Sequence, residues 1–255
     1  MQLTDTHTHI YYHATSNELD LQIKRCLDND INRLFLPNVD LKSIDLIRNT
    51  VTRFPNNCFP MLGLHPCSVK EDFHSVLEEM KKELGGSKVY AIGEIGLDLY
   101  WDKTTLSIQQ EAFRIQVGWA KELNLPIVIH CRDAFDELFD LLEELNDKKL
   151  RGVFHCFTGT IEQAKKAIDY GFYLGIGGVV TFKNAGLDKV VKEIDLQHLV
   201  LETDAPYLAP VPFRGKENES SYLRYVAEKV ADLHQVSVEE VADITTQNSR
   251  VVFGV

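Results

Sequence analysis

Short apolar runs alternate with amphipathic, helix-like segments along almost the whole chain. Residues 133–145, for example, place Phe135, Leu138, Leu142 and Leu145 at spacings of three and four, as on one face of a helix. Strand-length runs separated by helical segments are typical of parallel strands joined by crossover helices. This alternation restricts the chain to an α/β fold.

The apolar runs number eight: MQLTDTH, INRLFLPN, CFPMLGLHP, VYAIGEIGLD, PIVIHCR, GVFHCF, FYLGIGG and HLVLETDAP. Eight strand–helix units in 255 residues predict a (β/α)8 TIM barrel, with an open doubly wound sheet as the alternative. The longest helical segment, residues 104–125, begins at Thr104 as a candidate N-cap. Residues 236–255 predict an extra C-terminal helix. No low-complexity tract or Gly/Ser linker interrupts the chain, so we expect a single domain over residues 1–255.

Composition narrows the class of protein further. The net charge of −11 does not favour broad duplex binding, which depends on many contacts between basic residues and phosphates. The five cysteines include no C-x-x-C pair, which indicates a reduced, cytoplasmic protein without a disulfide framework. We expect no signal peptide and no contact with a membrane, because the longest apolar runs are strand-length.

The first run ends in TDTHTHI, which places His7 and His9 one residue apart behind Asp5. In a strand, residues i and i+2 point to the same face, so both imidazoles can reach one metal ion. Taken alone, the motif is weak evidence for a metal site and is compatible with two solvated histidines on a polar edge strand. The ends of the other runs decide between these interpretations.

Four further metal-capable side chains lie at the ends of other runs: Glu94, His130, His155 and Asp204. Active sites of such barrels form at the C-terminal ends of the strands, so these side chains should meet. Mixed nitrogen and oxygen ligands suit Zn, Mn, Fe, Ni or Mg. Six ligands exceed the need of one tetrahedral ion, so we predict two divalent ions with Glu94 as the bridging carboxylate.

These motifs resemble the TatD family of metal-dependent deoxyribonucleases, within the amidohydrolase superfamily. The matching stretches are TDTHTHI, GLHP, AIGEIGLD, LNLPIVIHCRDA, HCFTG, LETDAPYLAPVPFRGKENE and NSRVVFG, in family order from residue 4 to residue 254. The resemblance implies that one ion is held by His7, His9 and Asp204, that the other is held by His130 and His155, and that Glu94 bridges them.

The resemblance implies a hydrolase that cleaves phosphodiester bonds of DNA, and we predict a 3′–5′ exodeoxyribonuclease acting on single strands. Water activated by the two ions would attack phosphorus. Asp204 is a candidate general base, with a role as metal ligand only as the alternative. We expect a monomer that needs no protein partner.

Other functions and further contacts also follow from the sequence. The alternative activity is a metal-dependent esterase or amidohydrolase acting on a small molecule or on an ester of a modified nucleic acid. A third interpretation is a non-catalytic metal-binding barrel. Residues near the strand ends that could bind substrate are His65, Tyr100, Trp101, Arg132, Lys183, Arg214 and Lys216.

Overall fold

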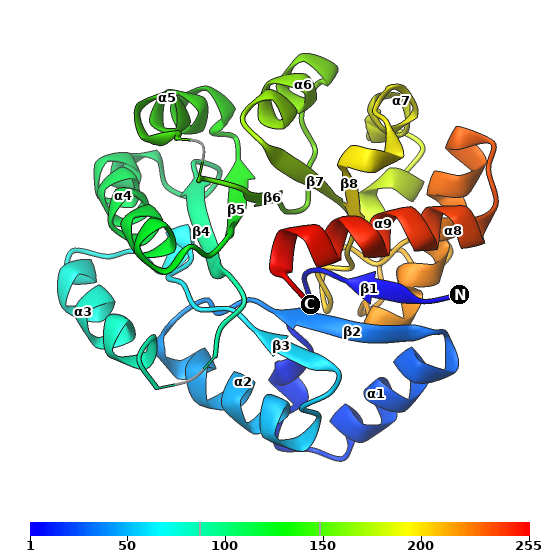
Figure 1. Cartoon of the computed structure of the whole chain (residues 1–255), viewed down its shortest axis with the longest axis horizontal. Helices are drawn as coiled ribbons and strands as arrows, with labels where there is room; N and C mark the ends of the chain where they lie inside the picture. The colour runs from blue at the N-terminus through cyan, green and yellow to red at the C-terminus, as the bar shows by residue number, and fades with distance from the viewer. Residues whose placement is uncertain (87, 148) are drawn as a thin grey trace.

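Eight parallel strands form a ring in the computed structural model, which describes residues 1–86, 88–147 and 149–255 (Figure 1). The strands are β1 (Leu3–Asp5), β2 (Ile31–Leu36), β3 (Cys58–Pro60), β4 (Ile92–Asp98), β5 (Ile127–Arg132), β6 (Gly152–Phe154), β7 (Phe172–Ile176) and β8 (Leu199–Leu201). Each strand pairs with its neighbour in the sequence inside two groups, β1–β3 and β4–β8.

Backbone hydrogen bonds join the two groups into a closed barrel. Between β3 and β4, Leu62 bridges Ile92 in parallel register, and the amide of Gly93 donates to the Leu62 carbonyl at 2.9 Å. Between β8 and β1, the amide of Thr6 donates to the Leu201 carbonyl at 3.0 Å. The predicted barrel is therefore confirmed, and the open-sheet alternative is wrong.

Helices cover the outside of the ring, as Figure 1 shows. They are α1 (Glu18–Asp28), α2 (Leu41–Arg53), α3 (Phe73–Glu83), α4 (Leu106–Leu123), α5 (Phe135–Leu145), α6 (Ile161–Asp169), α7 (Leu187–Glu193), α8 (Leu223–His234) and α9 (Val238–Phe253). Capping boxes fix the starts of α2 and α6: the side chains of Asp40 and Thr160 accept from the amides of Ser43 and Gln163.

The start of α4 differs from the prediction. Thr104 is not its N-cap but lies in a 3-10 turn, Lys103–Thr105, and its amide donates to the Asp102 side chain at 2.8 Å. Because Thr104 belongs to this turn, the N-cap of α4 is Thr105 and the helix begins at Leu106.

The extra helix α9 closes the N-terminal end of the barrel, where Figure 1 shows it beside β1 and β8. Its last turn carries Phe253, whose ring stacks on Phe35 of β2 with centroids 4.1 Å apart. Alternate residues of the other strands, such as Val128, Val153 and Val200, join the same buried cluster. The lower part of the barrel is therefore filled with apolar side chains, and polar groups can gather only at the other end.

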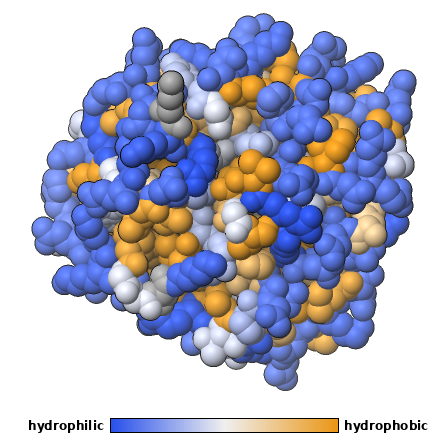
Figure 2. Space-filling model, in the orientation of Figure 1, coloured by the Kyte–Doolittle hydropathy of each residue, from blue (hydrophilic) through white to orange (hydrophobic). Residues whose placement is uncertain are grey.

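Figure 2 shows the face that carries α9, which is mainly hydrophilic with scattered apolar areas. A hollow of about 320 Å³ is lined by residues of α2, β3 and the segment before β4, and its lining includes none of the predicted metal ligands. In the described ranges, no helix is long and apolar enough to cross a bilayer.

Candidate metal centre

The polar side chains at the strand ends converge in one cluster at the C-terminal end of the barrel. The structure brings all six predicted ligands together: His7 and His9 after β1, Glu94 in β4, His130 in β5, His155 after β6 and Asp204 after β8. The cluster forms the floor of a cavity of about 620 Å³. Period-two alternation places it there: Val128 and Val153 point into the barrel below, so His130 and His155, two residues on, point inward above them.

One half of the cluster surrounds the Oε2 atom of Glu94. His7 Nε2 lies 3.1 Å from it and His9 Nε2 lies 3.8 Å from it. Asp204 Oδ1 lies 3.7 Å from His7 Nε2 and 3.4 Å from His9 Nε2. Ligand atoms bound tetrahedrally at about 2.0–2.2 Å from one ion lie about 3.3–3.6 Å apart, so these four donors are spaced to share a single cation.

The other half surrounds the Oε1 atom of Glu94. His130 Nδ1 and His155 Nε2 each lie 2.8 Å from this oxygen, and they lie 3.3 Å from each other. Glu94 thus turns one carboxylate oxygen to each half of the cluster. This is the arrangement that a bridging ligand requires.

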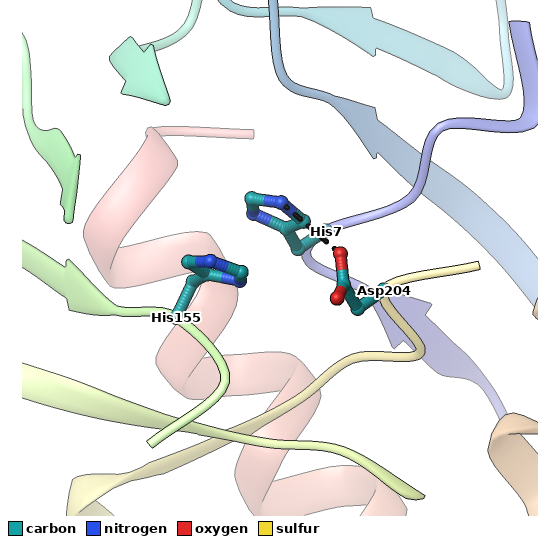
Figure 3. A group of neighbouring side chains, drawn as sticks. All are labelled: His7, His155 and Asp204. Carbon is teal, nitrogen blue, oxygen red and sulfur yellow. Dashed lines mark ion pairs between the residues drawn. The ribbon is translucent and has the colours of Figure 1, made fainter. Parts of the chain in front are cut away.

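His7 joins the two halves. Its ring stacks on His155 with centroids 3.8 Å apart and planes 11° apart, and Figure 3 shows Asp204 on its other side. His7 is fully buried, and its Nε2 atom faces two carboxylate oxygens, Glu94 Oε2 at 3.1 Å and Asp204 Oδ1 at 3.7 Å. A buried imidazole nitrogen that faces two anionic oxygens is suited to bind a cation together with them.

The charges of the cluster compensate one another. Burial opposes the ionised carboxylate of Glu94, but the imidazoles of His155, His65 and His7 outweigh burial and hold its pKa well below the usual range. Burial also opposes the charged form of His155, yet the carboxylates of Glu94 and Glu202 hold its pKa well above the usual range. Glu94 is therefore an anion among imidazoles, and protons and metal cations compete for the same nitrogens.

The donor set fits divalent cations. It consists of imidazole nitrogens and carboxylate oxygens, the ligand types that Zn, Mn and Fe share. Three groups of three lie close enough to hold an ion: His7, His9 and Glu94; His7, His155 and Asp204; and His65, Glu94 and His130. Glu94 and His7 each belong to two of these groups.

Comparison with known proteins identifies the family of this chain. The model of the TatD related DNase family matches residues 4–254. The chain belongs to the TatD family. The metal-dependent hydrolase YabD of Bacillus subtilis, which is uncharacterized, is 41% identical over 252 residues, 98% of each chain. The 3′-5′ ssDNA/RNA exonuclease TatD of Shigella flexneri is 32% identical over 94% of each chain.

Solved structures agree with the family assignment. The TatD homologue YJJV of Escherichia coli superimposes with a TM-score of 0.93 at 27% identity, covering 99% of this chain and 98% of that one. The predicted family is therefore confirmed, and the protein is a metal-dependent hydrolase of the TatD family.

Three side chains that orient the ligands of this TatD protein were not recognised from the sequence. Asp98 Oδ2 accepts from His130 Nε2 at 2.9 Å, which leaves Nδ1 to face Glu94 Oε1 at 2.8 Å. The Tyr11 hydroxyl donates to the Pro37 carbonyl at 2.8 Å, so it accepts from Nδ1 of His9 at 2.8 Å and leaves Nε2 free. Fixing the tautomer through the distal nitrogen is the usual function of such partners.

The third orienting side chain is Glu202, which is fully buried. Its Oε1 atom lies 3.4 Å from His155 Nδ1 and accepts from the Cys156 amide at 2.6 Å. A side chain at Gly175 would place its Cβ 2.2 Å from the Oε2 atom of Glu202, so only glycine leaves room for this carboxylate. The sequence signal for Glu202 is its position two residues before Asp204, on the same face.

Asp5 links β1 to the segment after β8. Its carboxylate accepts from the Thr203 hydroxyl at 2.6 Å, from the Thr203 amide at 3.0 Å and from the His7 amide at 3.3 Å. Burial raises the pKa of Asp5 to about 7. This brace fixes His7 relative to Asp204.

Three of the seven predicted substrate contacts line the cavity: His65, Trp101 and Arg132. Tyr100 does not line it but lies against Arg132, whose guanidinium is 3.7 Å from the centroid of the Tyr100 ring. Nδ1 of His65 accepts from the Cys67 amide at 3.0 Å, so Nε2 carries the proton and points to Glu94 Oε1 at 3.2 Å. His65 is therefore oriented as a hydrogen-bond donor.

The remaining three basic residues do not line the cavity: Lys183, Arg214 and Lys216. The Arg214 guanidinium lies over the Phe182 ring at 4.4 Å, and the Lys216 ammonium lies 6.0 Å from the centroid of the Phe213 ring. These cations lie in the segments after β7 and β8, and their role in binding substrate stays a prediction.

Proposed function

We propose that this protein is a two-metal phosphodiesterase that removes nucleotides from the 3′ end of single-stranded DNA. The observation that carries the proposal is Glu94, which turns one oxygen to each of two ligand groups on the floor of an open cavity. The name of the Shigella flexneri relative, a 3′-5′ ssDNA/RNA exonuclease, supports the substrate and the polarity.

His7, His9 and Asp204 would hold one cation, His130 and His155 would hold the other, and Glu94 would bridge them. When bound, the cations supply Lewis-acid stabilisation of phosphoryl charge and lower the pKa of water. Two cations of this kind suit in-line attack of water on a phosphodiester.

Asp204 is the candidate proton acceptor. Burial opposes its ionised form, but the hydrogen bond with His9 and the nearby imidazoles of His155 and His7 hold its pKa below the usual range. A carboxylate ionised at neutral pH can orient the attacking water and take its proton. Its side chain is partly open to the cavity, which water needs for access.

His65 and Arg132 would bind the phosphate. The protonated Nε2 of His65 faces the cluster and can donate to a phosphoryl oxygen once a cation engages Glu94. Arg132 lines the cavity, where its guanidinium can form a bidentate contact with phosphate oxygens. All these groups come from one chain, so we expect the monomer to be active.

The test uses single-stranded DNA labelled at either end, incubated with Mg, Mn or Zn and with the wild type or Glu94→Ala. Stepwise, metal-dependent shortening from the 3′ end by the wild type, and loss of at least about 100-fold in the variant, is the expected result. Glu143→Ala, which removes an exposed carboxylate from α5, is the matched control and should retain full activity. An RNA of the same sequence tests whether the 2′-hydroxyl is tolerated.

Intact DNA in the presence of wild-type protein that demonstrably holds its metals would overturn the nuclease proposal. The second candidate is then hydrolysis of a carboxyl ester or amide, which the same activated water can attack. The observation that favours it is the scarcity of positive charge: Arg132 is the one Lys or Arg among the described residues that line the cavity. Turnover of chromogenic esters would distinguish the two.

A further inference from the structure

The exposed aromatic side chains of the described chain all lie around the mouth of the metal centre. They are Trp101 at 73% exposure, Tyr100 at 53%, Tyr207 at 51% and Tyr12 at 41%. The other large aromatic rings of the described ranges are buried or half-buried. Apolar surface left in water and gathered at one place marks a binding site, because random exposure would scatter it.

Two of these rings, with Arg132, form what we call the β4 platform: Tyr100, Trp101 and Arg132. Asp98 Oδ1 accepts from the Tyr100 amide at 3.0 Å and from the Trp101 amide at 3.4 Å, while Oδ2 holds His130. The Arg132 guanidinium lies 3.7 Å from the Tyr100 centroid and 5.6 Å from that of Trp101. The platform is therefore tied through one carboxylate to a ligand of the metal centre.

The other two rings, with Leu208, form what we call the β8 platform: Tyr12, Tyr207 and Leu208. The Tyr12 ring stacks on His9 with centroids 5.5 Å apart, and the Tyr207 ring meets His9 edge-on at 5.9 Å. This platform therefore borders the opposite half of the ligand cluster.

The backbone of the β8 platform is held in an uncommon conformation. Leu208 is 41% exposed, and its φ of 55° lies in the left-handed region that leucine rarely adopts. Its carbonyl oxygen lies 2.1 Å from the point where a Cβ on Gly178 would stand, and Asn218 Nδ2 donates to the Tyr207 carbonyl at 2.6 Å. A segment that holds apolar side chains in water at the cost of backbone strain is typical of a functional site.

The two platforms face each other across the metal centre. β1 and β8 are neighbours in the ring, β4 and β5 are neighbours on the opposite side, and Figure 1 shows this separation. Trp101, Tyr12 and Tyr207 all line the cavity whose floor is the ligand cluster. A ligand that engages both platforms must therefore carry two flat apolar groups, with the reacting bond between them.

We propose that each platform stacks one of the two nucleobases that flank the scissile phosphodiester, an inference that rests on the proposed nuclease function. Aromatic side chains stack on any base, which suits a substrate of varied sequence. A paired base in a duplex has both faces covered by its neighbours, so the two platforms together select unpaired strands. Phosphomonoesters and esters with one ring would engage a single platform.

The test combines base removal from the substrate with ring removal from the protein. Single-stranded oligonucleotides carry an abasic residue on the 5′ side or on the 3′ side of the first bond to be cleaved, and kcat/KM is measured with the wild type, Trp101→Ala and Tyr207→Ala. Each abasic residue should lower the wild-type value about tenfold, as each alanine should on the intact strand. Each alanine variant should be insensitive to one of the two abasic residues, because the ring that would have met that base is gone.

Three controls keep the outcomes separate. Trp101→Phe and Tyr207→Phe retain a flat ring and should stay within about threefold of the wild type. Leu21→Ala removes an exposed apolar side chain from α1 and should behave as the wild type. Equal losses by an alanine variant on all three oligonucleotides, or no loss, would overturn the two-platform inference while leaving the nuclease function intact. Failure of metal-loaded wild type to shorten the intact strand would instead overturn the proposed function.

Discussion

At the scale of single residues, the metal centre depends on which nitrogen of each histidine carries its proton. His130 donates from Nε2 to Asp98 and His9 donates from Nδ1 to Tyr11, so in each ring the other nitrogen points into the cluster. These hydrogen bonds hold one proton on the distal nitrogen, and the nitrogen that faces the cluster is the one at which a cation replaces a second proton. Losing the orienting partner should therefore weaken metal binding even though every ligand remains.

Asp98→Asn tests this dependence. The amide keeps the size of the carboxylate but loses its charge and can present its NH2 group to His130, so we expect the affinity for a divalent cation to fall about 10- to 100-fold. Titration of the metal-free protein with Zn or Mn measures it. Asp102→Asn, a nearby exposed position whose side chain caps a 3-10 turn, should leave the affinity unchanged. An unaltered affinity in Asp98→Asn would show that His130 is oriented by packing alone.

The pKa shifts predict a dependence on pH. Without metal, burial opposes the charged forms of His130 and His155, but Glu94 and its neighbouring carboxylates raise both pKa values above the ordinary 6.5. Raised pKa values mean that the folded protein binds these protons more tightly than the unfolded chain, so their stabilisation is complete below about pH 6.5 and is lost as the pH rises through the raised values. Cations must displace the same protons, so apparent metal affinity should rise with pH.

Two measurements check this prediction. Urea unfolding of the metal-free protein should give a lower free energy of unfolding at about pH 9 than at about pH 6, and metal titrations should give tighter binding at the higher pH. His155→Gln should flatten the stability profile. A metal-free protein that is more stable at the higher pH would contradict the assigned charges.

At the scale of elements, strands β7 and β8 are coupled by the space that Gly175 leaves for Glu202. Gly175→Ala would place a methyl group 2.2 Å from Glu202 Oε2, so the carboxylate must move and His155 loses its partner. We expect a destabilisation of about 1–3 kcal/mol, as for overpacking elsewhere, together with weaker metal binding.

Gly118→Ala is the matched control for this prediction. Gly118 lies inside α4, and a Cβ there would meet no atom of the described structure within 4 Å. Alanine should therefore raise the free energy of unfolding by about 0.5–1 kcal/mol. Opposite signs at the two positions, read from urea unfolding, are the expected result. Destabilisation of equal size at both positions would contradict the account, because it would mean that the loss at Gly175 does not come from the contact with Glu202.

The elements also show what the sequence could predict. Most of the ligands were predictable because they stand at or near the end of an apolar run, where a barrel must gather its polar residues; Glu94 is the exception, since it lies within β4. Glu202 and Asp98 carry a weaker signal, because each shares an apolar run with a second acidic residue, Asp204 or Glu94, that is itself a predicted ligand. Tyr11 carries none: its partner Pro37 is 26 residues away, and the pairing of β1 with β2 brings the segments after these strands together.

At the scale of the whole molecule, the barrel separates stability from chemistry. Helix α9 and the rings of Phe35 and Phe253 fill the N-terminal end, while the ligands and the two platforms occupy the C-terminal end. The extra helix was predictable from periodicity. Its position as a plug was not, because the packing of Phe253 on Phe35 joins residues from opposite ends of the chain.

The measurement that tests the central claim most directly is a count of bound divalent ions at saturation. The two halves of the ligand cluster around Glu94 predict two ions per chain in the wild type. They predict one ion after either His9→Ala or His130→Ala, because each change removes a ligand from a different half. The two variants should retain native folding, checked by circular dichroism. A single ion in the wild type would contradict the bridging role of Glu94 and, with it, the two-metal mechanism.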